Sequence, residues 1–426
     1  MPNVRSRTHL LPLLLLALTA SGTLAQSLPR VAPEEVGVSD ARLERLTTAF
    51  RDYVDREQLA GAVVLLARDG KVFYQQAFGV RDRERDSAMK TDAIFRIASQ
   101  SKALISVAIM ILQDEGRLLL SDPLSKYIPE FRQTTVAVRR EGGGYDVVPA
   151  RRQITLRDLL THTAGIGYGQ GVAADQWQAA GIQGWYFANR AEPVAATVAR
   201  MPALPNDAQP GERFVYGYNT DILGVVVERA SGVPLDEFIR TRITEPLGMK
   251  DTHFYLPAAK RDRLATVYSR RDTTGLTRAP DGCCMEAQGE YVDGPRRSFS
   301  GGAGILSTAG DYARFLEMLR NGGELDGVRI LSRKTVELMT SDHTGTIYNT
   351  PGMGFGLGWW VVEDIGPRGT PGSVGEYGWG GAYHSTYWVD PKERLVVVYM
   401  TNLIPAAQVD DHAKLRTLVY QALEKQ

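Results

Sequence analysis

A run of apolar and small residues places the strongest single constraint on how this chain folds. Residues 103–112 read Ala-Leu-Ile-Ser-Val-Ala-Ile-Met-Ile-Leu, with Ser106 as the one polar side chain. A helix that is apolar on every face is buried, either in a protein core or in a membrane. A bilayer span takes about 20 residues, and this run is much shorter. The run therefore predicts a buried core helix on which other elements pack.

A serine and a lysine stand at the start of this helix, in Phe95-Arg-Ile-Ala-Ser-Gln-Ser-Lys102. Residues three apart share one face of a helical turn, so Ser99 and Lys102 are expected to be neighbours. A serine hydroxyl is a weak nucleophile until a base takes its proton. Burial and the helix N-terminus both disfavour a charged Lys102, and the helix N-terminus favours an oxyanion near Ser99. The pair is thus a candidate nucleophile and base.

The alternative is that Ser99 caps the helix and Lys102 is a solvated first-turn residue. Ser-x-x-Lys is common by chance, so this short pattern taken alone favours the structural interpretation. The choice depends on the motifs elsewhere in the chain.

The composition is that of an ordinary globular protein large enough to bury a sizeable core. The chain has 426 residues, 43% of them hydrophobic, and 49 basic side chains balance 49 acidic ones. A net charge near zero gives no electrostatic reason to expect a nucleic-acid or anionic-membrane partner. The two cysteines, Cys283 and Cys284, are adjacent, and a disulfide between them needs strained geometry. They are a weak signal for a redox or metal site, and we expect no disulfide framework.

Residues 1–25 have the three parts of a secretory signal peptide. Arg5 and Arg7 form a basic start, residues 10–18 a short apolar run, and Thr23-Leu-Ala25 a cleavage point before Gln26. The alternative is an anchor that stays in the membrane, which the shortness of the run disfavours. The mature chain is expected to be periplasmic or secreted, without a stable membrane span.

Hydrophobic periodicity divides the rest of the chain into strand-rich ends and a helical middle. Residues 26–38 read as a linker, and a helix is expected at 41–57, followed by a hairpin that turns at Asp69-Gly70. Further strands are expected at 356–362, 383–389 and 395–400, before a last helix at 410–424. Helices are also expected at 220–230 and 235–243. The aromatic loop 166–190 is a candidate pocket wall, and 255–300 a covering loop region.

This order predicts an α/β (α+β) fold, with one mixed, mainly antiparallel sheet built from both ends of the chain and flanked by helices. The α/β lobe is expected at 39–125 and 301–426, with an inserted, mostly helical lobe at 126–300. A ligand is expected in a cleft between the two lobes.

Several segments then occur in a recognisable order. They are Phe95–Lys102, Leu159-Leu-Thr-His-Thr-Ala-Gly165, Phe214-Val-Tyr-Gly-Tyr-Asn-Thr-Asp-Ile-Leu-Gly224, Gly301-Gly-Ala-Gly304 and Gly378-Trp-Gly-Gly381. With this set the chain resembles the serine β-lactamase/penicillin-binding superfamily, on its class C β-lactamase and D-Ala-D-Ala carboxypeptidase side. Within it, the chain looks most like the family VIII carboxylesterases. The resemblance covers roughly residues 35–425 and implies a β-lactamase/transpeptidase-like domain at 39–426.

The resemblance implies a role for each matched residue. Ser99 matches the acylated nucleophile, Lys102 its partner, and Tyr216 a second-motif phenol able to carry a proton. Without the resemblance, Tyr216 would be interpreted as a packed core tyrosine. The backbone N–H groups of Ser99 and Ala382 would form the oxyanion hole. The strand where β-lactamases carry Lys-Thr-Gly is represented here by Trp379, Gly380 and Gly381.

Two departures from the β-lactamase pattern bear on the substrate. The second motif, usually Tyr-x-Asn, has Tyr218 in the third place, and Asn219 comes one position late. In the third motif, Trp379 replaces a lysine, which removes a cation that could pair with a substrate carboxylate. Both changes favour uncharged, apolar esters over penicillins or D-Ala-D-Ala peptides. Tyr218 and His384 are candidate substrate contacts.

Other chemistries find little support in the sequence. Gly-x-Ser-x-Gly and His-Glu-x-x-His are both absent, and the six histidines show no pair at metal spacing, so we expect no metal and no cofactor. His162 is interpreted as structural, and Asp221 with Glu228 as facing solvent or closing a helix end. The expected activity is ester hydrolysis, with a small-molecule ester or amide as the partner. The alternatives are a β-lactamase or D-amino-acid peptidase, and a non-catalytic binding protein on the same fold.

Overall fold

A computed structural model describes residues 27–272 and 275–425 of the chain. The predicted signal peptide, residues 1–25, lies outside the described residues. Among the described residues, no helix combines the length and the apolar character needed to cross a membrane.

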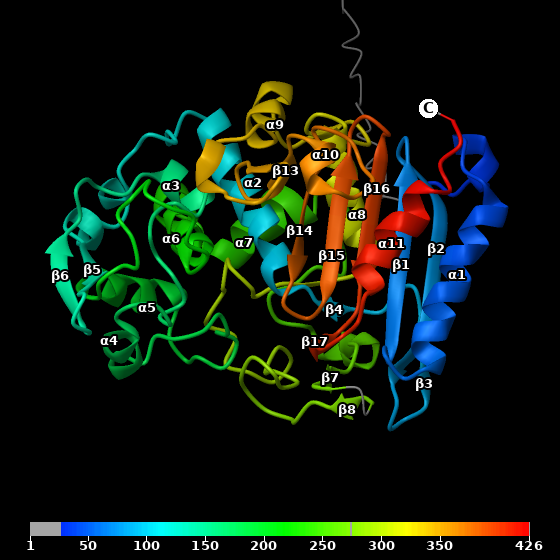
Figure 1. Cartoon of the computed structure of the whole chain (residues 1–426), viewed down its shortest axis with the longest axis horizontal. Coiled ribbons are helices and arrows are strands. Elements are labelled where there is room, and N and C mark those ends of the chain that lie inside the picture. Colours follow the sequence, from blue (N-terminus) through cyan, green and yellow to red (C-terminus); the bar gives the residue numbers. More distant parts are fainter. Residues whose placement is uncertain (1–26, 273–274, 426) are drawn as a thin grey trace, which may run out of the picture.

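One eight-stranded sheet forms the centre of the molecule, in the order β12-β13-β14-β15-β16-β1-β2-β3, and every neighbouring pair in it is antiparallel (Figure 1). The N-terminal strand β1 pairs with the C-terminal strand β16, with Val63 opposite Met400. Both ends of the chain thus build one sheet, which confirms the predicted fold class. The strands are β1 (Gly61–Arg68), β2 (Lys71–Asp82), β3 (Ser87–Ala88), β12 (Met353–Phe355), β13 (Trp360–Val362), β14 (Tyr377–Gly381), β15 (Ser385–Asp390) and β16 (Leu395–Met400).

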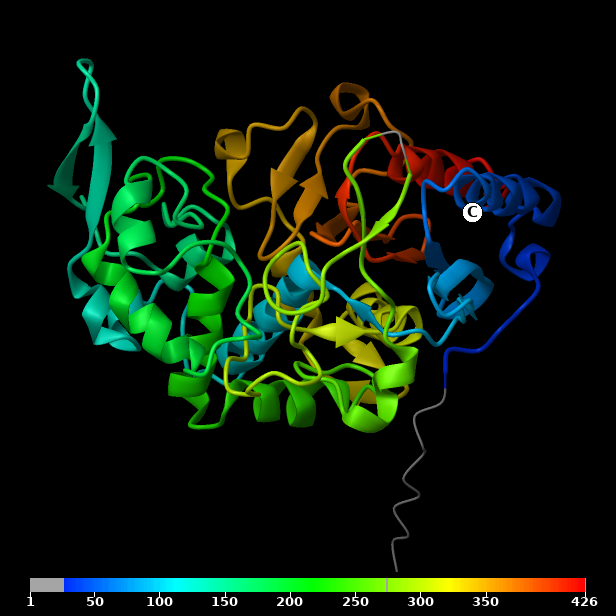
Figure 2. The same cartoon turned by 90° about the horizontal axis from the view of Figure 1, so that it is seen from below.

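Helices cover both faces of the sheet, because alternate side chains of β1 and β16 enter two different cores. Val64 and Val397 join the core under α1 (Asp40–Asp55) and α11 (Asp411–Tyr420). Val63 and Val398 join the larger core with α2 (Ser101–Asp114) and α8 (Ala309–Arg320). In Figure 2, α1 and α11 lie side by side at one end of the molecule, and α2 runs through its middle. Residues 103–112 are all buried within α2, as predicted.

The segment between residues 126 and 300 is mainly helices and loops. Its part up to about residue 230 lies beyond one edge of the sheet, whereas residues 268–278 lie beneath the sheet (Figure 1). Its helix α6 packs against α2, so the buried helix joins the two parts. The elements here are β5 (Thr135–Arg139), β6 (Tyr145–Pro149), α3 (Leu156–Leu160), α4 (Ala174–Ala179), α5 (Val194–Arg200), α6 (Asn219–Ser231), α7 (Leu235–Ile239), β7 (Tyr268–Arg270) and β8 (Thr277–Arg278).

Short pairs and helices complete the structure. Strand β4 (Phe95–Arg96), which leads to Ser99, pairs with β9 (Leu306–Ser307). The others are β10 (Glu324–Leu325), β11 (Val328–Arg329), α9 (Arg333–Met339), α10 (Ile365–Arg368) and β17 (Leu403–Ala406).

Three expected elements differ from those observed. The strand predicted at 356–362 is broken, because β12 ends at Phe355 and the chain turns at Gly358, whose φ of 112° suits glycine. The strand predicted from 383 begins at Ser385, since His384 occupies a turn with φ 67°. The helix predicted at 235–243 ends at Ile239 and continues as a π-helical turn.

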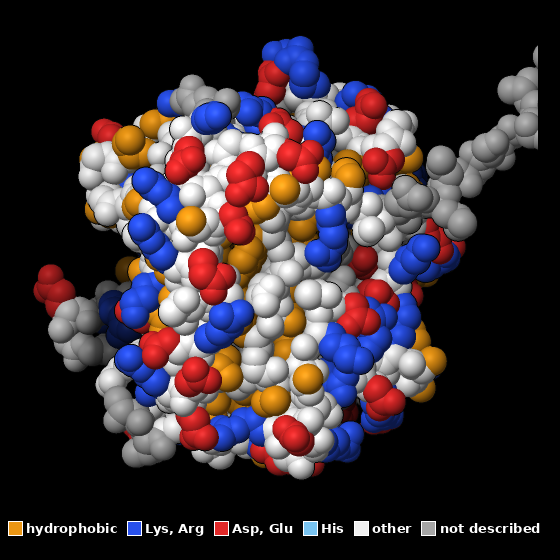
Figure 3. Space-filling model, turned by 90° about the vertical axis from the view of Figure 1, so that its right-hand side faces the viewer, with side chains coloured by type: hydrophobic (Ala, Val, Ile, Leu, Met, Phe, Trp, Pro, Cys, Tyr) orange, Lys and Arg blue, Asp and Glu red, His pale blue; other side chains and the backbone are white. Residues whose placement is uncertain are grey.

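The face shown in Figure 3 carries basic and acidic side chains that are intermixed. This distribution matches the balanced composition, in which Lys and Arg equal Asp and Glu in number.

Candidate active site

Ser99 and Lys102 are held together where β4 turns into α2. Ala98, just before the serine, has a φ of 41°, which is a strained value for a residue other than glycine. Ser99 lies in the short turn Ala98–Gln100, and Lys102 lies in the first turn of α2 with 1% of its surface exposed. Lys102 Nζ lies 3.2 Å from Ser99 Oγ. Neither the turn nor α2 has a side-chain cap, so the alternative of a capping serine and a solvated lysine is wrong.

The Lys102 ammonium has two further acceptors, both far away in sequence. It donates to the Tyr168 hydroxyl at 3.1 Å and to the Gly302 carbonyl at 2.7 Å. Burial raises the pKa of the Tyr168 phenol well above its ordinary value, and neighbouring Tyr216 and Asp221 act in the same direction. Tyr168 is therefore protonated at neutral pH and holds Lys102 as a hydroxyl. The sequence indicated Tyr168 only as one aromatic residue of a loop.

Tyr216 contacts Lys102 in another way. Lys102 Nζ lies 4.7 Å from the centroid of the Tyr216 ring, a cation–π contact. The Tyr216 hydroxyl accepts a hydrogen bond from Trp379 Nε1 at 3.1 Å. The phenol hydrogen-bonded to Lys102 in the described structure is thus Tyr168, and the proton-carrying role of Tyr216 stays a prediction.

A glycine-rich strand closes the site from the other side. Gly381 lies so near the Ile97 carbonyl that a Cβ would collide with it. A glycine is needed here because β14 closely approaches the turn that holds Ser99. The Trp379 ring packs edge-on against Phe355, with centroids 5.4 Å apart. Ala382 follows directly in the turn after β14.

A pocket of about 760 Å³ brings these groups together. Ser99, Tyr168, Tyr216 and the segment 379–382 all line it. Three tryptophans, Trp185, Trp360 and Trp379, give it apolar walls, and no Lys, Arg, Asp or Glu is among its described lining residues. Such a lining suits an uncharged organic ligand.

Two neighbouring residues of the second motif, one of them a candidate substrate contact, lie in the core instead. Tyr218 has no exposed surface, and its hydroxyl donates to the Gly184 carbonyl at 2.7 Å. Its interpretation as a substrate contact is therefore wrong, because the core encloses it. Asn219 also lies inside, where its amide contacts His162 Nδ1 at 2.9 Å. Burial lowers the pKa of His162 well below its ordinary value, so this histidine is neutral beneath Tyr216.

The expectation that Asp221 faces solvent is also wrong. Asp221 is 1% exposed, and its Oδ1 accepts hydrogen bonds from Ser300 Oγ at 2.6 Å and from Gly302 N–H at 3.0 Å. Burial raises the pKa of its carboxyl, whereas Ser300 and Lys102 act to lower it. Asp221 thereby holds the loop whose Gly302 carbonyl binds Lys102.

Two histidines that are far apart in the sequence lie next to each other in the structure. His384 and His412 both line the pocket, and their rings stack with centroids 4.2 Å apart. His384 Nε2 lies 2.7 Å from Asp411 Oδ1. Among the described residues, these three form the group whose donor atoms are near enough to hold a metal ion, within 4.8 Å of one another. No spacing in sequence reveals this, because 28 positions separate the histidines.

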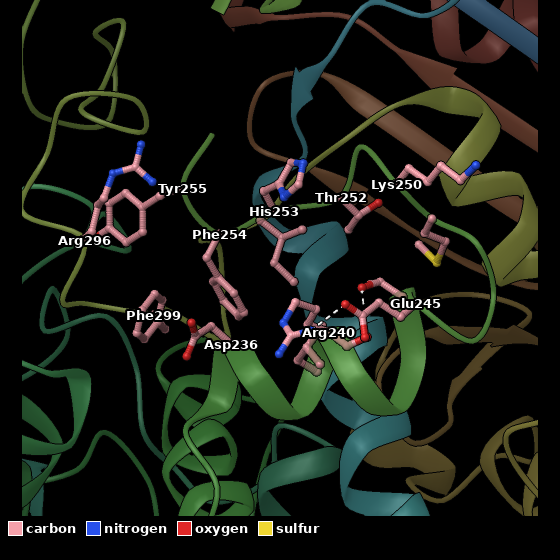
Figure 4. A pocket seen from close by; sticks show the side chains of 14 residues that line it. Asp236, Arg240, Glu245, Lys250, Thr252, His253, Phe254, Tyr255, Arg296 and Phe299 are labelled. Atoms are coloured by element: carbon pink, nitrogen blue, oxygen red, sulfur yellow. Dashed lines mark hydrogen bonds and ion pairs between the residues drawn. The ribbon is translucent and has the colours of Figure 1, made fainter. Parts of the chain in front are cut away.

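A separate pocket of about 570 Å³ lies between the Arg240–Thr244 turn and residues 252–255 (Figure 4). Phe254, Tyr255 and Phe299 line it, and Arg240 pairs with Glu245 there. The Ser99–Lys102 pair is not part of this lining, so the candidate active site is the pocket at Ser99.

Known proteins resemble this chain in sequence and in fold. The family model described as Beta-lactamase matches residues 46–421. Esterase EstB of Burkholderia gladioli is 33% identical over 375 residues, which cover 84% of this chain and 90% of that protein. The ML-236A carboxylate methylbutanoyltransferase of Penicillium citrinum is 30% identical over 319 residues, 72% of each chain. The solved structure of EstCE1, described as a hydrolase with promiscuous acyltransferase activity, has a TM-score of 0.78 at 30% identity and covers 89% of this chain and 98% of its own. The chain therefore belongs to the β-lactamase family of serine hydrolases.

Proposed function

We propose that this protein hydrolyses carboxylic esters through an acyl-enzyme at Ser99, and that it does so outside the cytoplasm. The observation that carries the activity is the contact of a buried Lys102 with Ser99 at the base of a pocket without charged lining residues. The relatives named as an esterase and as a hydrolase support the same reaction.

The reaction follows from the groups at the site. Lys102 donates to Ser99, Tyr168 and Gly302 as an ammonium, so it must first give up one proton before it can act as a base. Ser99 Oγ then attacks the ester carbonyl carbon, while the Lys102 amine, with Tyr216 beside it, takes the hydroxyl proton. The backbone N–H groups of Ser99 and Ala382 stabilise the oxyanion. The C–O bond to the alcohol then breaks, and the alcohol leaves with the proton. Water attacks the acyl-Ser99 ester in the same way, which releases the acid and restores the serine.

The pocket favours esters over β-lactams for a reason of charge. A penicillin carries a carboxylate, and none of the described lining residues is a lysine or arginine that would pair with it. Trp379 occupies the strand position at which β-lactamases carry a lysine, and its indole N–H is already bonded to Tyr216.

Side-by-side turnover of p-nitrophenyl butyrate and nitrocefin tests this preference. We expect kcat/KM for the ester to exceed that for nitrocefin by roughly 10²-fold or more, since a desolvated, unpaired carboxylate costs several kcal/mol. Steady-state kinetics on the purified mature chain measure the ratio, with Ser99→Ala as the background. Equal or faster nitrocefin turnover would assign the protein to the β-lactamase or peptidase alternatives.

Acyl transfer to an alcohol is a second candidate activity. The three tryptophan walls can hold an apolar acceptor beside the acyl-serine, where it competes with water. Two relatives carry acyltransferase descriptions. The same acyl-enzyme serves both reactions, because an alcohol can replace water as the attacking group.

Export is proposed on the pattern of residues 1–25. If they are a signal peptide, the mature protein begins at Gln26. Expression of the full chain in a Gram-negative host, followed by N-terminal sequencing of the periplasmic fraction, measures this. Full-length protein in the membrane fraction would instead identify the segment as a retained anchor.

A further inference from the structure

His384 is held in an unfavourable backbone conformation inside the active-site pocket. Its φ is 67°, in the left-handed region where glycine is at ease and other residues are strained. His384 lies two positions after Ala382, and it lines the pocket that contains Ser99. Such strain persists only where surrounding contacts maintain it, and it gathers at functional sites.

Those contacts orient the imidazole. His384 Nε2 bonds to Asp411 Oδ1 at 2.7 Å, and Asp411 Oδ2 accepts from the Tyr399 hydroxyl at 2.6 Å. Burial acts to raise the pKa of Asp411, but its bond to His384 and the charges of His384 and His412 outweigh burial and hold the pKa below its ordinary value. Asp411 is thus an acceptor at neutral pH, and His384 donates through Nε2–H.

The other ring nitrogen is left for a ligand. Nε2 is bonded to Asp411, and Nδ1 has no hydrogen bond among those described; a hydroxyl group can either donate to an imidazole nitrogen or accept from its N–H. The stacked ring of His412 fixes the plane, with an interplanar angle of 18°, and His412 Nε2 bonds to the His384 carbonyl at 3.0 Å. Because the His384 and His412 rings are nearly parallel, their nitrogen lone pairs do not point at one common metal ion. This arrangement argues against a metal site formed by these two histidines.

We propose that His384, positioned by Asp411, determines specificity by forming a hydrogen bond at Nδ1 with a hydroxyl group of the substrate. The inference rests on the proposed acyl transfer at Ser99 and names the substrate class. The preferred substrates are esters that carry a free hydroxyl, on the acyl chain or on the alcohol portion.

Two matched substrate pairs separate these sources. p-Nitrophenyl 3-hydroxybutyrate against p-nitrophenyl butyrate tests the acyl chain, and 2-hydroxyethyl butyrate against propyl butyrate tests the alcohol. We expect one pair to show a preference of roughly fivefold in kcat/KM for the hydroxylated ester, the size of one neutral hydrogen bond. Absence of a preference in both pairs would overturn the inference. Loss of all ester turnover would instead contradict the proposed function.

Variants then identify the residue responsible. His384→Gly suits the left-handed backbone and should fold, and Asp86→Gly, at φ 47° in an exposed turn, is the matched control. The preference should fall to about one in His384→Gly and remain in Asp86→Gly. Because each ratio is taken within one enzyme, a general change in activity cancels.

Asp411→Ala separates the orientation of the imidazole from its presence. Alanine removes the carboxylate that holds Nε2, so Nδ1 is no longer directed at the substrate. The preference should therefore also fall to about one in this variant, with the His384 ring still present. A preference that survives in either variant, or Zn²⁺ binding in calorimetry that His384→Gly abolishes, would overturn the inference.

Discussion

Replacing Ser99 with alanine is expected to reduce kcat/KM for p-nitrophenyl butyrate by roughly 10³-fold or more, because the covalent route is then closed. The variant should fold, since Ser99 Oγ accepts one described hydrogen bond, from Lys102, and the Lys102 ammonium keeps Tyr168 and Gly302 as acceptors. Steady-state kinetics give the ratio, and circular dichroism checks the fold.

A fluorophosphonate probe provides the complementary measurement. We expect the native chain to gain the mass of one phosphonyl adduct, with the label on the peptide that contains Ser99, and the alanine variant to gain none. Full ester turnover by Ser99→Ala would remove Ser99 as the nucleophile. An unlabelled native chain would support the non-catalytic alternative.

The second large effect is expected from removing the hydroxyl of Tyr216. Tyr216→Phe keeps the ring beside Lys102 but loses the phenol that the family resemblance makes the proton carrier. A loss of roughly 10²- to 10³-fold in kcat is expected, the usual contribution of a general acid–base group. Steady-state and single-turnover kinetics with p-nitrophenyl butyrate measure it.

Tyr168→Phe is the matched comparison, because it removes the other phenol near the same ammonium. Burial keeps Tyr168 protonated, so its hydroxyl positions Lys102, and a loss of about tenfold is expected from one missing hydrogen bond to a charged group. A reversed order, with Tyr168→Phe the slower enzyme, would move the proton-carrying role to Tyr168.

The sequence was sufficient to predict those features that depend only on residues near one another in the chain. The apolar run 103–112 required a buried helix, and helical geometry alone places Lys102 beside Ser99. Asp69-Gly70 predicted the hairpin of β1 and β2 for the same reason, because turn conformation depends on adjacent residues.

Contacts between segments far apart in the sequence could not be predicted from the sequence patterns. Tyr168 and Gly302 reach Lys102 from 66 and 200 positions away. The sequence predicts that Asp221 faces solvent or closes a helix end, since its place in a helix does not show that a second loop covers it. Such placements depend on how whole elements pack, which a periodic pattern does not encode.

The sequence by itself thus determined the candidate site's starting point: a buried helix with a serine and a lysine at its start, in a chain of the β-lactamase family. Only the tertiary structure decided what surrounds this pair. In the folded chain Tyr218 is buried in the core, and Tyr168 is the phenol that hydrogen-bonds to Lys102. His384 and His412 line the pocket, and Asp411 contacts His384. The physical reason is that spacing along a helix brings near neighbours together, whereas a pocket is formed by segments that only the packed core brings into contact.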